Sequence, residues 1–355
     1  MPQPSDGLLS QPVETPPSEW SPRRDKSPDG RTPMPRIPAL IAIAALAVQA
    51  TFSARAAQGA EASYYQLPPG TGPHDVAPAS DGTVWYTGQR KGVLGRLDPK
   101  TGKTEEIPLG PGASPHGVII GPDGAAWVTE GGQNAIARVD PATKMVKLFP
   151  LPKEFPDANL NTATFDKKGV LWFTGQTGVY GRLDPAKGKV EAWAAPKGRG
   201  PYGITTTPSG EVWYASLAGD HIARIDTATG AATVVDPPKP GSGPRRVWSD
   251  SKGVLWVSLW RTGGIGRFDP ATKSWKVYPM QKSTTGTYSV FVDDKDRVWA
   301  SDWPANAIQR FDPKTEAYET FVSNKSGANV RQMLGRPGEA WAAESGTNRL
   351  AVVRD

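Results

Sequence analysis

Residues 114–141 read SPHGVIIGPDGAAWVTEGGQNAIARVDP, and this stretch is the clearest copy of a unit that recurs along most of the chain. It predicts three short strands: an apolar run after Pro115, a second run through Trp127 after a turn at 122–124, and a third run ending at Val139. The central tryptophan of the unit recurs seven times, as Trp85, Trp127, Trp172, Trp213, Trp256, Trp299 and Trp341.

The spacing of these tryptophans is 42, 45, 41, 43, 43 and 42 residues. Repeats of about 40–50 residues with four short strands each are typical of β-propellers. In six repeats a fourth apolar run precedes the next copy, but the seventh repeat, 331–355, supplies only three. Residues 64–68 resemble the missing strand. The sequence therefore predicts an all-β, seven-bladed propeller of four-stranded blades, whose ring an N-terminal strand closes.

The segment before the repeats divides into two parts. Residues 1–33 are rich in Pro, Ser and charge, which predicts disorder or a mis-assigned start. Residues 34–56 hold a basic residue, an apolar run (37–52) and an Ala-x-Ala site, the form of a signal peptide. The apolar run is shorter than the roughly 20 residues of a membrane span. We expect cleavage near Ala56-Ala57, a periplasmic or secreted propeller over 57–355, and no stable span in the mature chain.

The amino-acid composition argues against nucleic-acid binding and against cysteine chemistry. The 355 residues carry a formal charge of +6, spread over the repeats, which predicts no nucleic-acid partner. The absence of cysteine excludes thiolate catalysis and cysteine metal sites. We expect a monomer that binds a small-molecule or peptide-like ligand at the mouth of the central channel.

The pairing of residues across each hairpin predicts which side chains lie at the rim of the channel. With the turn of the second repeat centred on Asp123, His116 should face Glu130 across the two strands. Equivalent first-strand positions in chain order are His74, His116, Asn161, Tyr202, Arg245, Tyr288 and Arg331. Their expected second-strand partners are Gly88, Glu130, Gly175, Ser216, Leu259, Asp302 and Glu344. The first set is polar or aromatic throughout, which indicates a functional rim around the channel.

Two of the three histidines, His74 and His116, occupy the same position in adjacent repeats. A neutral imidazole suits proton abstraction near neutral pH. The third, His221, falls between the second and third strands of its repeat, where we expect a surface loop.

The repeats resemble those of the virginiamycin B lyase family. The resemblance covers residues 64–355 and is carried by motifs that stand here as Ser114-Pro115-His116-Gly117-Val118, Gly200-Pro201-Tyr202-Gly203-Ile204 and Gly169-Val170-Leu171-Trp172-Phe173-Thr174-Gly175. It implies a propeller that opens a cyclic depsipeptide antibiotic, a streptogramin, by elimination rather than hydrolysis.

The resemblance also implies roles for particular residues. By motif position His116 would be the general base, Glu130 a ligand of Mg²⁺, and His74 a second catalytic or supporting histidine. Apart from the resemblance, the rim positions lead us to expect that the substrate contacts Tyr202, Arg245, Tyr288, Arg331 and Asn161. The chain departs from the family in that Ser114 stands at the position of the second metal carboxylate. One carboxylate fewer should weaken Mg²⁺ binding.

Two other functions remain open from the sequence. One is a non-catalytic binding propeller, in which Arg245, Arg331, Tyr202 and Tyr288 hold an acidic or peptide ligand. The other is a Ca²⁺-dependent, lactonase-like hydrolase, for which Glu130, Asp302, Glu344 and Asn161 are the candidate ligands.

Overall fold

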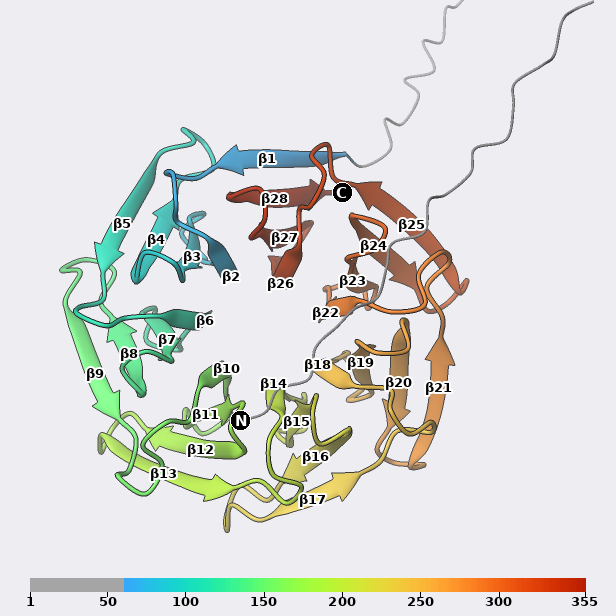
Figure 1. The fold of residues 1–355 in the computed structure, drawn as a ribbon, viewed down its shortest axis with the longest axis horizontal. Helices are drawn as coiled ribbons and strands as arrows, with labels where there is room; N and C mark the ends of the chain where they lie inside the picture. The colour runs from blue at the N-terminus through green and yellow to red at the C-terminus, as the bar shows by residue number, and fades with distance from the viewer. Residues whose placement is uncertain (1–60) are drawn as a thin grey trace, which may run out of the picture. The chain divides into compact units, whose positions relative to one another are not determined.

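The computed structural model describes residues 61–355, which form a ring of seven antiparallel four-stranded sheets (Figure 1). This confirms the predicted seven-bladed propeller. Within this range the chain forms no α-helix, and hence none that could cross a membrane. The segments 1–33 and 34–56, with the expected cleavage site, lie outside the described residues.

Each blade runs outward from the channel in strand order. The innermost strands are β2 (Pro73–Pro78), β6 (Pro115–Ile120), β10 (Leu160–Phe165), β14 (Pro201–Thr206), β18 (Pro244–Ser249), β22 (Thr287–Val292) and β26 (Val330–Arg336). The second strands are β3 (Val84–Gly88), β7 (Ala126–Glu130), β11 (Leu171–Gly175), β15 (Val212–Ser216), β19 (Leu255–Leu259), β23 (Val298–Asp302) and β27 (Glu339–Glu344).

The third strands are β4 (Val93–Leu97), β8 (Ala135–Val139), β12 (Val179–Asp184), β16 (His221–Ile225), β20 (Ile265–Asp269), β24 (Ala307–Asp312) and β28 (Arg349–Arg354). The outer strands are β5 (Thr104–Pro108), β9 (Val146–Pro150), β13 (Lys189–Ala194), β17 (Ala232–Val235), β21 (Ser274–Tyr278), β25 (Ala317–Val322) and β1 (Ala62–Gln66). The last sheet has the order β1-β28-β27-β26, so β1 from the start of the propeller is its outer strand.

The repeated tryptophans fill the space between blades. Trp127 stacks on Phe149 of its own blade and meets Phe165 of the next edge-on, with both ring centroids 5.7 Å away. Its indole N–H donates to Asp123 Oδ1 (3.0 Å), and Arg138 from the third strand lies over the ring. The repeated tryptophan and arginine therefore stabilise the fold.

The innermost strands share an irregularity that the repeat pattern does not reveal. In the second blade Val118 pairs with Val128, but Pro115 pairs with Glu130, so two residues oppose one between these pairs. The same β-bulge occurs in all seven blades. The expected pairing of His116 with Glu130 is therefore wrong by one residue, because the bulge inserts a residue before the strand end.

A hydroxyl on the second strand holds this bulge in place. Thr129 Oγ1 accepts the N–H of Gly117 (2.8 Å) and donates to the carbonyl of Asn161 in the next blade (2.5 Å). Both groups are buried, so the hydroxyl satisfies a donor and an acceptor that the regular ladder leaves free. Four hydroxyls make both bonds, and they belong to Thr87, Thr129, Thr174 and Ser258. These side chains join consecutive blades around the channel.

Replacing Thr129 with valine should lower the free energy of unfolding by about 1–3 kcal/mol, because it leaves buried polar groups unpaired at nearly constant volume. Urea denaturation of the purified protein measures the change. Thr233→Val is the matched control, since Thr233 is exposed on β17. Equal free energies of unfolding for the two variants would contradict the role given to the hydroxyl.

Removing residues 62–68 should lower the Tm by on the order of 10 °C. The deletion takes away β1, the buried Leu67 and the stacking of Tyr65 on Trp341, and it leaves β28 with an open edge. A chain shortened by seven residues immediately before Ala62 is the control for length. Thermal melts that coincide for the two chains would show that β1 does not stabilise the ring.

Candidate functional site

The bulge directs two consecutive residues of each innermost strand toward the channel. His74 and Asp75 illustrate this, because they are neighbours in sequence and yet their side chains hydrogen-bond. The first residues form what we call the mouth ring: His74, His116, Asn161, Tyr202, Arg245, Tyr288 and Arg331. The second residues form the inner ring: Asp75, Gly117, Thr162, Gly203, Arg246, Ser289 and Gln332. The structure thus brings together every first-strand residue that the sequence singled out.

One hydrogen-bond chain crosses the mouth ring from Arg245 to Asp75. Arg245 Nη2 donates to the Tyr202 hydroxyl (2.7 Å), which lies 2.6 Å from that of Tyr288. The Tyr288 hydroxyl is 3.3 Å from His74 Nε2, and His74 Nδ1 is 2.7 Å from Asp75 Oδ1. Burial raises the pKa of Asp75, whereas its ion pair with Arg246 favours the carboxylate. Because a carboxylate only accepts, Nδ1 of His74 carries the proton and Nε2 is the basic atom of the ring.

A second chain leads from Arg246 to His116. Arg246 pairs with Asp75 Oδ1 (3.2 Å) and donates to the Thr162 hydroxyl (2.5 Å), which in turn donates to Asn161 Oδ1 (2.7 Å). This orients Asn161 so that its amide nitrogen faces His116 Nε2 at 3.1 Å. The proton of His116 therefore sits on Nδ1, which is buried and has no partner among the described residues.

The two imidazoles pack against each other with centroids 3.7 Å apart. His74 is 3% exposed and His116 5%, and burial holds the pKa of both well below the usual value, helped by Arg246 at His74 and by His74 at His116. Both rings are therefore neutral at pH 7. Neutral, buried histidines with a shifted pKa are typical of catalytic sites.

Positive charge surrounds this pair. Arg245 lies over the Tyr288 ring, 3.7 Å from its centroid, and Arg331 Nη1 is 3.5 Å from the Tyr288 hydroxyl. Burial raises the pKa of Tyr288, but Arg245, Arg246 and Arg331 outweigh it, so that the pKa falls below the usual range. The two rings together hold three guanidinium groups and one carboxylate, Asp75, which favours an anionic ligand or intermediate.

The expected second-strand partners do not join this network. Glu130 Oε1 accepts the backbone N–H groups of Ser114 and Gly132, and burial raises the pKa of the carboxyl. Asp302 bonds Ser283, and Glu344 pairs with Arg349. Each of these carboxylates is therefore bonded to groups near it in the same blade and does not contact the histidine pair.

The donors at the mouth fit Mg²⁺ poorly. Glu130 has one carboxylate oxygen left, Oε2, which is buried and has no partner in the described part of the chain, and Ser114 offers no second carboxylate. In residues 61–355 the group that could hold a metal is His74, Asp75 and His116, with ligand atoms within 4.8 Å of one another. This group offers two nitrogens and a carboxylate already paired with Arg246, whereas Mg²⁺ and Ca²⁺ prefer several oxygen ligands.

An aromatic pocket that the repeat pattern did not single out borders the mouth ring. Trp260 and Trp303 meet edge-to-face at 5.3 Å; Trp303 also stacks on Tyr288, and Arg245 lies over Trp260. They line a surface pocket of about 500 Å³. The sequence could have indicated this pocket. Trp260 and Trp303 each directly follow the last residue of a second strand, Leu259 and Asp302, and these strand ends lie at the rim of the channel.

The third histidine departs from expectation. His221 begins β16 and is fully buried, rather than lying in a surface loop, and its Nδ1 bonds the carbonyl of Gly219 (2.9 Å). The turn has the same length as in the second blade, where Ala135 begins β8 and pairs with Glu130, so the equivalent His221 begins the third strand and pairs with Ser216. It belongs to the third strand of its blade and not to the mouth ring.

Solved structures with the same fold include three of lyases. A streptogramin B lyase has a TM-score of 0.76 at 23% identity, and the match covers 83% of this chain and 97% of that one. Virginiamycin B lyase from Staphylococcus aureus has a TM-score of 0.77 at 23% identity, covering 83% and 99%. A catalytically inactive histidine-to-alanine variant of that enzyme with quinupristin scores 0.77 at 22% identity. At these identities the likeness shows the shared fold.

Other neighbours are parts of larger proteins. The extracellular domain of a protein described as a hybrid two-component system, from B. thetaiotaomicron, has a TM-score of 0.65 at 17% identity, covering 82% of this chain and 42% of that one. Comparison with curated protein sequences returned no match.

The sequence itself carries the family relationship. Residues 45–176 and 110–355 match the model of the Virginiamycin B lyase family, and together they span the whole propeller. The chain belongs to the virginiamycin B lyase family.

Proposed function

We propose that the mouth ring is the active site of a carbon–oxygen lyase that opens an ester by elimination. One observation supports this most: a pair of buried, neutral imidazoles lies at the mouth of the channel, and one ring nitrogen, His116 Nδ1, has no partner among residues 61–355. Ten side-chain atoms in residues 61–355 are buried without a partner, and His116 Nδ1 is the one that belongs to the imidazole pair, where a bound ligand would complete its bonding.

The two histidines have complementary hydrogen-bonding states. His74 presents a basic Nε2, and Asp75 behind it would stabilise the imidazolium that forms when it takes a proton. His116 carries a buried N–H on Nδ1, and a substrate carbonyl that reaches it would accept this hydrogen bond. In the elimination a C–H bond beside a carbonyl breaks and its proton goes to imidazole. The electron pair forms a carbon–carbon double bond, and the C–O bond breaks to release a carboxylate.

The arginines supply the positive charge that this reaction needs. A carboxylate leaves, and negative charge develops on the carbonyl beside the broken C–H bond. Arg245 and Arg331 border the pair from two blades, and a guanidinium suits carboxylate recognition through paired N–H groups. Because the donors fit Mg²⁺ poorly, no step is assigned to a metal.

Family membership and the named relatives suggest the substrate class. Two of the lyases named above act on streptogramin B or virginiamycin B, and one structure holds quinupristin. We therefore propose a cyclic depsipeptide or similar ester, with Trp260 and Trp303 contacting its apolar part. A periplasmic or secreted location, with residues 34–56 as a signal peptide, is part of the same proposal.

A second function has its own support. Each member of the mouth ring hydrogen-bonds to another member. Arg245, Arg331, Tyr202 and Tyr288 form a connected group beside the aromatic pocket. Such an arrangement suits a propeller that binds an anionic or peptide ligand without changing it. A lactonase-like hydrolase has less support, because the carboxylates it would need are held within separate blades.

Incubation of the mature protein with quinupristin, followed by mass spectrometry, separates these functions. A lyase should yield a ring-opened product of unchanged mass, since elimination adds no water, whereas hydrolysis adds the mass of one water. His116→Ala should lower the rate by about 100-fold or more. His116→Asn, which retains an N–H donor, should keep more activity than alanine if His116 donates, and no more than alanine if it is the base.

Two arms complete the experiment. His221→Asn is the matched control for a histidine outside the mouth ring and should leave turnover unchanged. Assays with EDTA and with added Mg²⁺, on wild type and Ser114→Glu, test whether a restored carboxylate creates a metal response. Binding of quinupristin without turnover in any of these proteins, lost in Arg331→Met, would replace the lyase with the binding function.

A further inference from the structure

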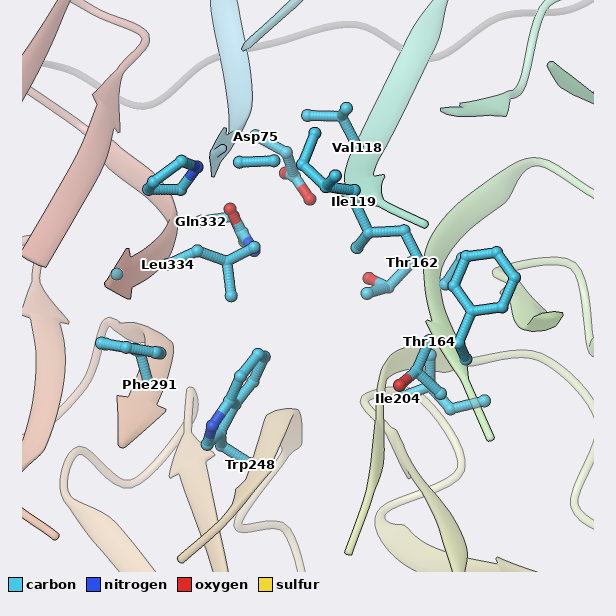
Figure 2. A pocket seen from close by; sticks show the side chains of 16 residues that line it. Asp75, Val118, Ile119, Thr162, Thr164, Ile204, Trp248, Phe291, Gln332 and Leu334 are labelled. Atoms are coloured by element: carbon cyan, nitrogen blue, oxygen red, sulfur yellow. The ribbon is translucent and has the colours of Figure 1, made fainter. Parts of the chain in front are cut away.

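Beyond the inner ring, the other half of the channel is a cavity of about 290 Å³ that is separate from the mouth ring (Figure 2). It is lined by the later residues of the innermost strands. Its open end is formed by half-buried side chains, among them Ile119, Thr164, Trp248 and Leu334. The cavity therefore communicates with solvent on the face opposite the mouth ring.

The walls of this cavity are apolar. Ile119, Ile204, Trp248, Phe291 and Leu334 come from five different blades and surround its centre. The cavity has room for about ten water-sized groups. A mostly apolar, concave site with a few polar groups is the usual form of a small-molecule site.

The polar groups lie together at the inner end. Asp75 uses Oδ1 for both His74 and Arg246, and no residue in 61–355 bonds its Oδ2. Gln332 accepts the N–H of Val76 through Oε1 (3.1 Å), whereas its Nε2 has no partner in this part of the chain. Gln332 is only 5% exposed, and Figure 2 shows Asp75 and Gln332 directed at the open centre. An acceptor and a donor therefore face the cavity side by side.

Charge restricts what can bind there. Arg246 neutralises Asp75 at 3.2 Å, and Arg245 and Arg331 lie beyond them in the mouth ring. A carboxylate ligand would place its charge beside Asp75, and a cation would meet repulsion from the arginines. A neutral group with one donor and one acceptor suits the cavity best.

We propose that this cavity binds a neutral small molecule with a primary carboxamide and an aromatic body. The amide N–H donates to Asp75 Oδ2, the amide oxygen accepts from Gln332 Nε2, and the aromatic part packs between Trp248, Phe291 and Leu334. The cavity opens on the face opposite the mouth ring and is argued without the lyase function, although the two sites share Asp75, whose Oδ1 bonds His74.

Benzamide, benzoate and toluene test the proposal, because they share the ring and differ in the polar group. In titrations of the purified propeller followed by ligand-observed NMR, benzamide should bind with a Kd on the order of 1 mM. Benzoate and toluene should bind at least 10-fold more weakly. Equal affinities for benzamide and toluene, or no binding of benzamide at ten times that concentration, would overturn the proposal.

Two variants locate the binding. Thr164→Trp should fill the open end and reduce benzamide affinity at least 10-fold, while Thr233→Trp on β17 should not change it. Gln332→Glu keeps the acceptor for Val76 and removes the donor, so it should also reduce the affinity at least 10-fold. If Thr164→Trp does not fold, Gln332→Glu decides alone. Unchanged affinity in a folded Thr164→Trp or in Gln332→Glu would show that benzamide does not occupy the channel.

Discussion

Hydrogen bonds from a hydroxyl on the second strand, made in full by Thr87, Thr129, Thr174 and Ser258, stabilise the start of the channel on which the site depends. Thr129 shows the arrangement: it satisfies the backbone N–H that the bulge frees and binds the carbonyl of the next blade. The bulge turns two consecutive residues toward the channel, so the seven blades supply a second ring, in which five of the seven residues have polar side chains and Gly117 and Gly203 have none. Without it, His74 and Asp75 would point to opposite faces of their strand, and the imidazole would lose its carboxylate partner.

The tryptophan spacing was enough to predict seven blades and the seven residues of the mouth ring. The tryptophan spacing alone does not reveal the bulge, because an extra residue near a strand end leaves that spacing unchanged. As a result the pairing of His116 with Glu130 was wrong by one residue, and the inner ring was missed, including Asp75, Arg246 and Gln332. The threonine or serine after the central tryptophan was the available signal, since it recurs in five blades opposite the bulge.

Electrostatics at the channel follow from this geometry. Three arginines and one aspartate lie around two buried imidazoles, so the protonated form of each histidine is disfavoured by burial and, at His74, by Arg246. A folded-state pKa below 6.5 means that the unfolded chain binds more protons as the pH falls. The free energy of unfolding is therefore not reduced by these histidines above about pH 6.5. As the pH falls below 6.5 toward their lower folded-state pKa, the free energy of unfolding decreases. The proposed reaction also requires neutral imidazoles. Burial of His74 and His116 keeps them neutral, so we expect activity and the free energy of unfolding to fall over the same pH range.

The chain contains three histidines, so their side-chain titration can be followed individually by nitrogen-15 NMR with single histidine-to-asparagine variants for assignment. This measurement tests the central claim, that the bulge buries a neutral imidazole pair at the channel mouth. We predict that His74 and His116 both stay neutral well below pH 6.5, with the proton on Nδ1 of each ring. Titration of either ring at or above pH 6.5, or a proton on Nε2 of either, would contradict the account.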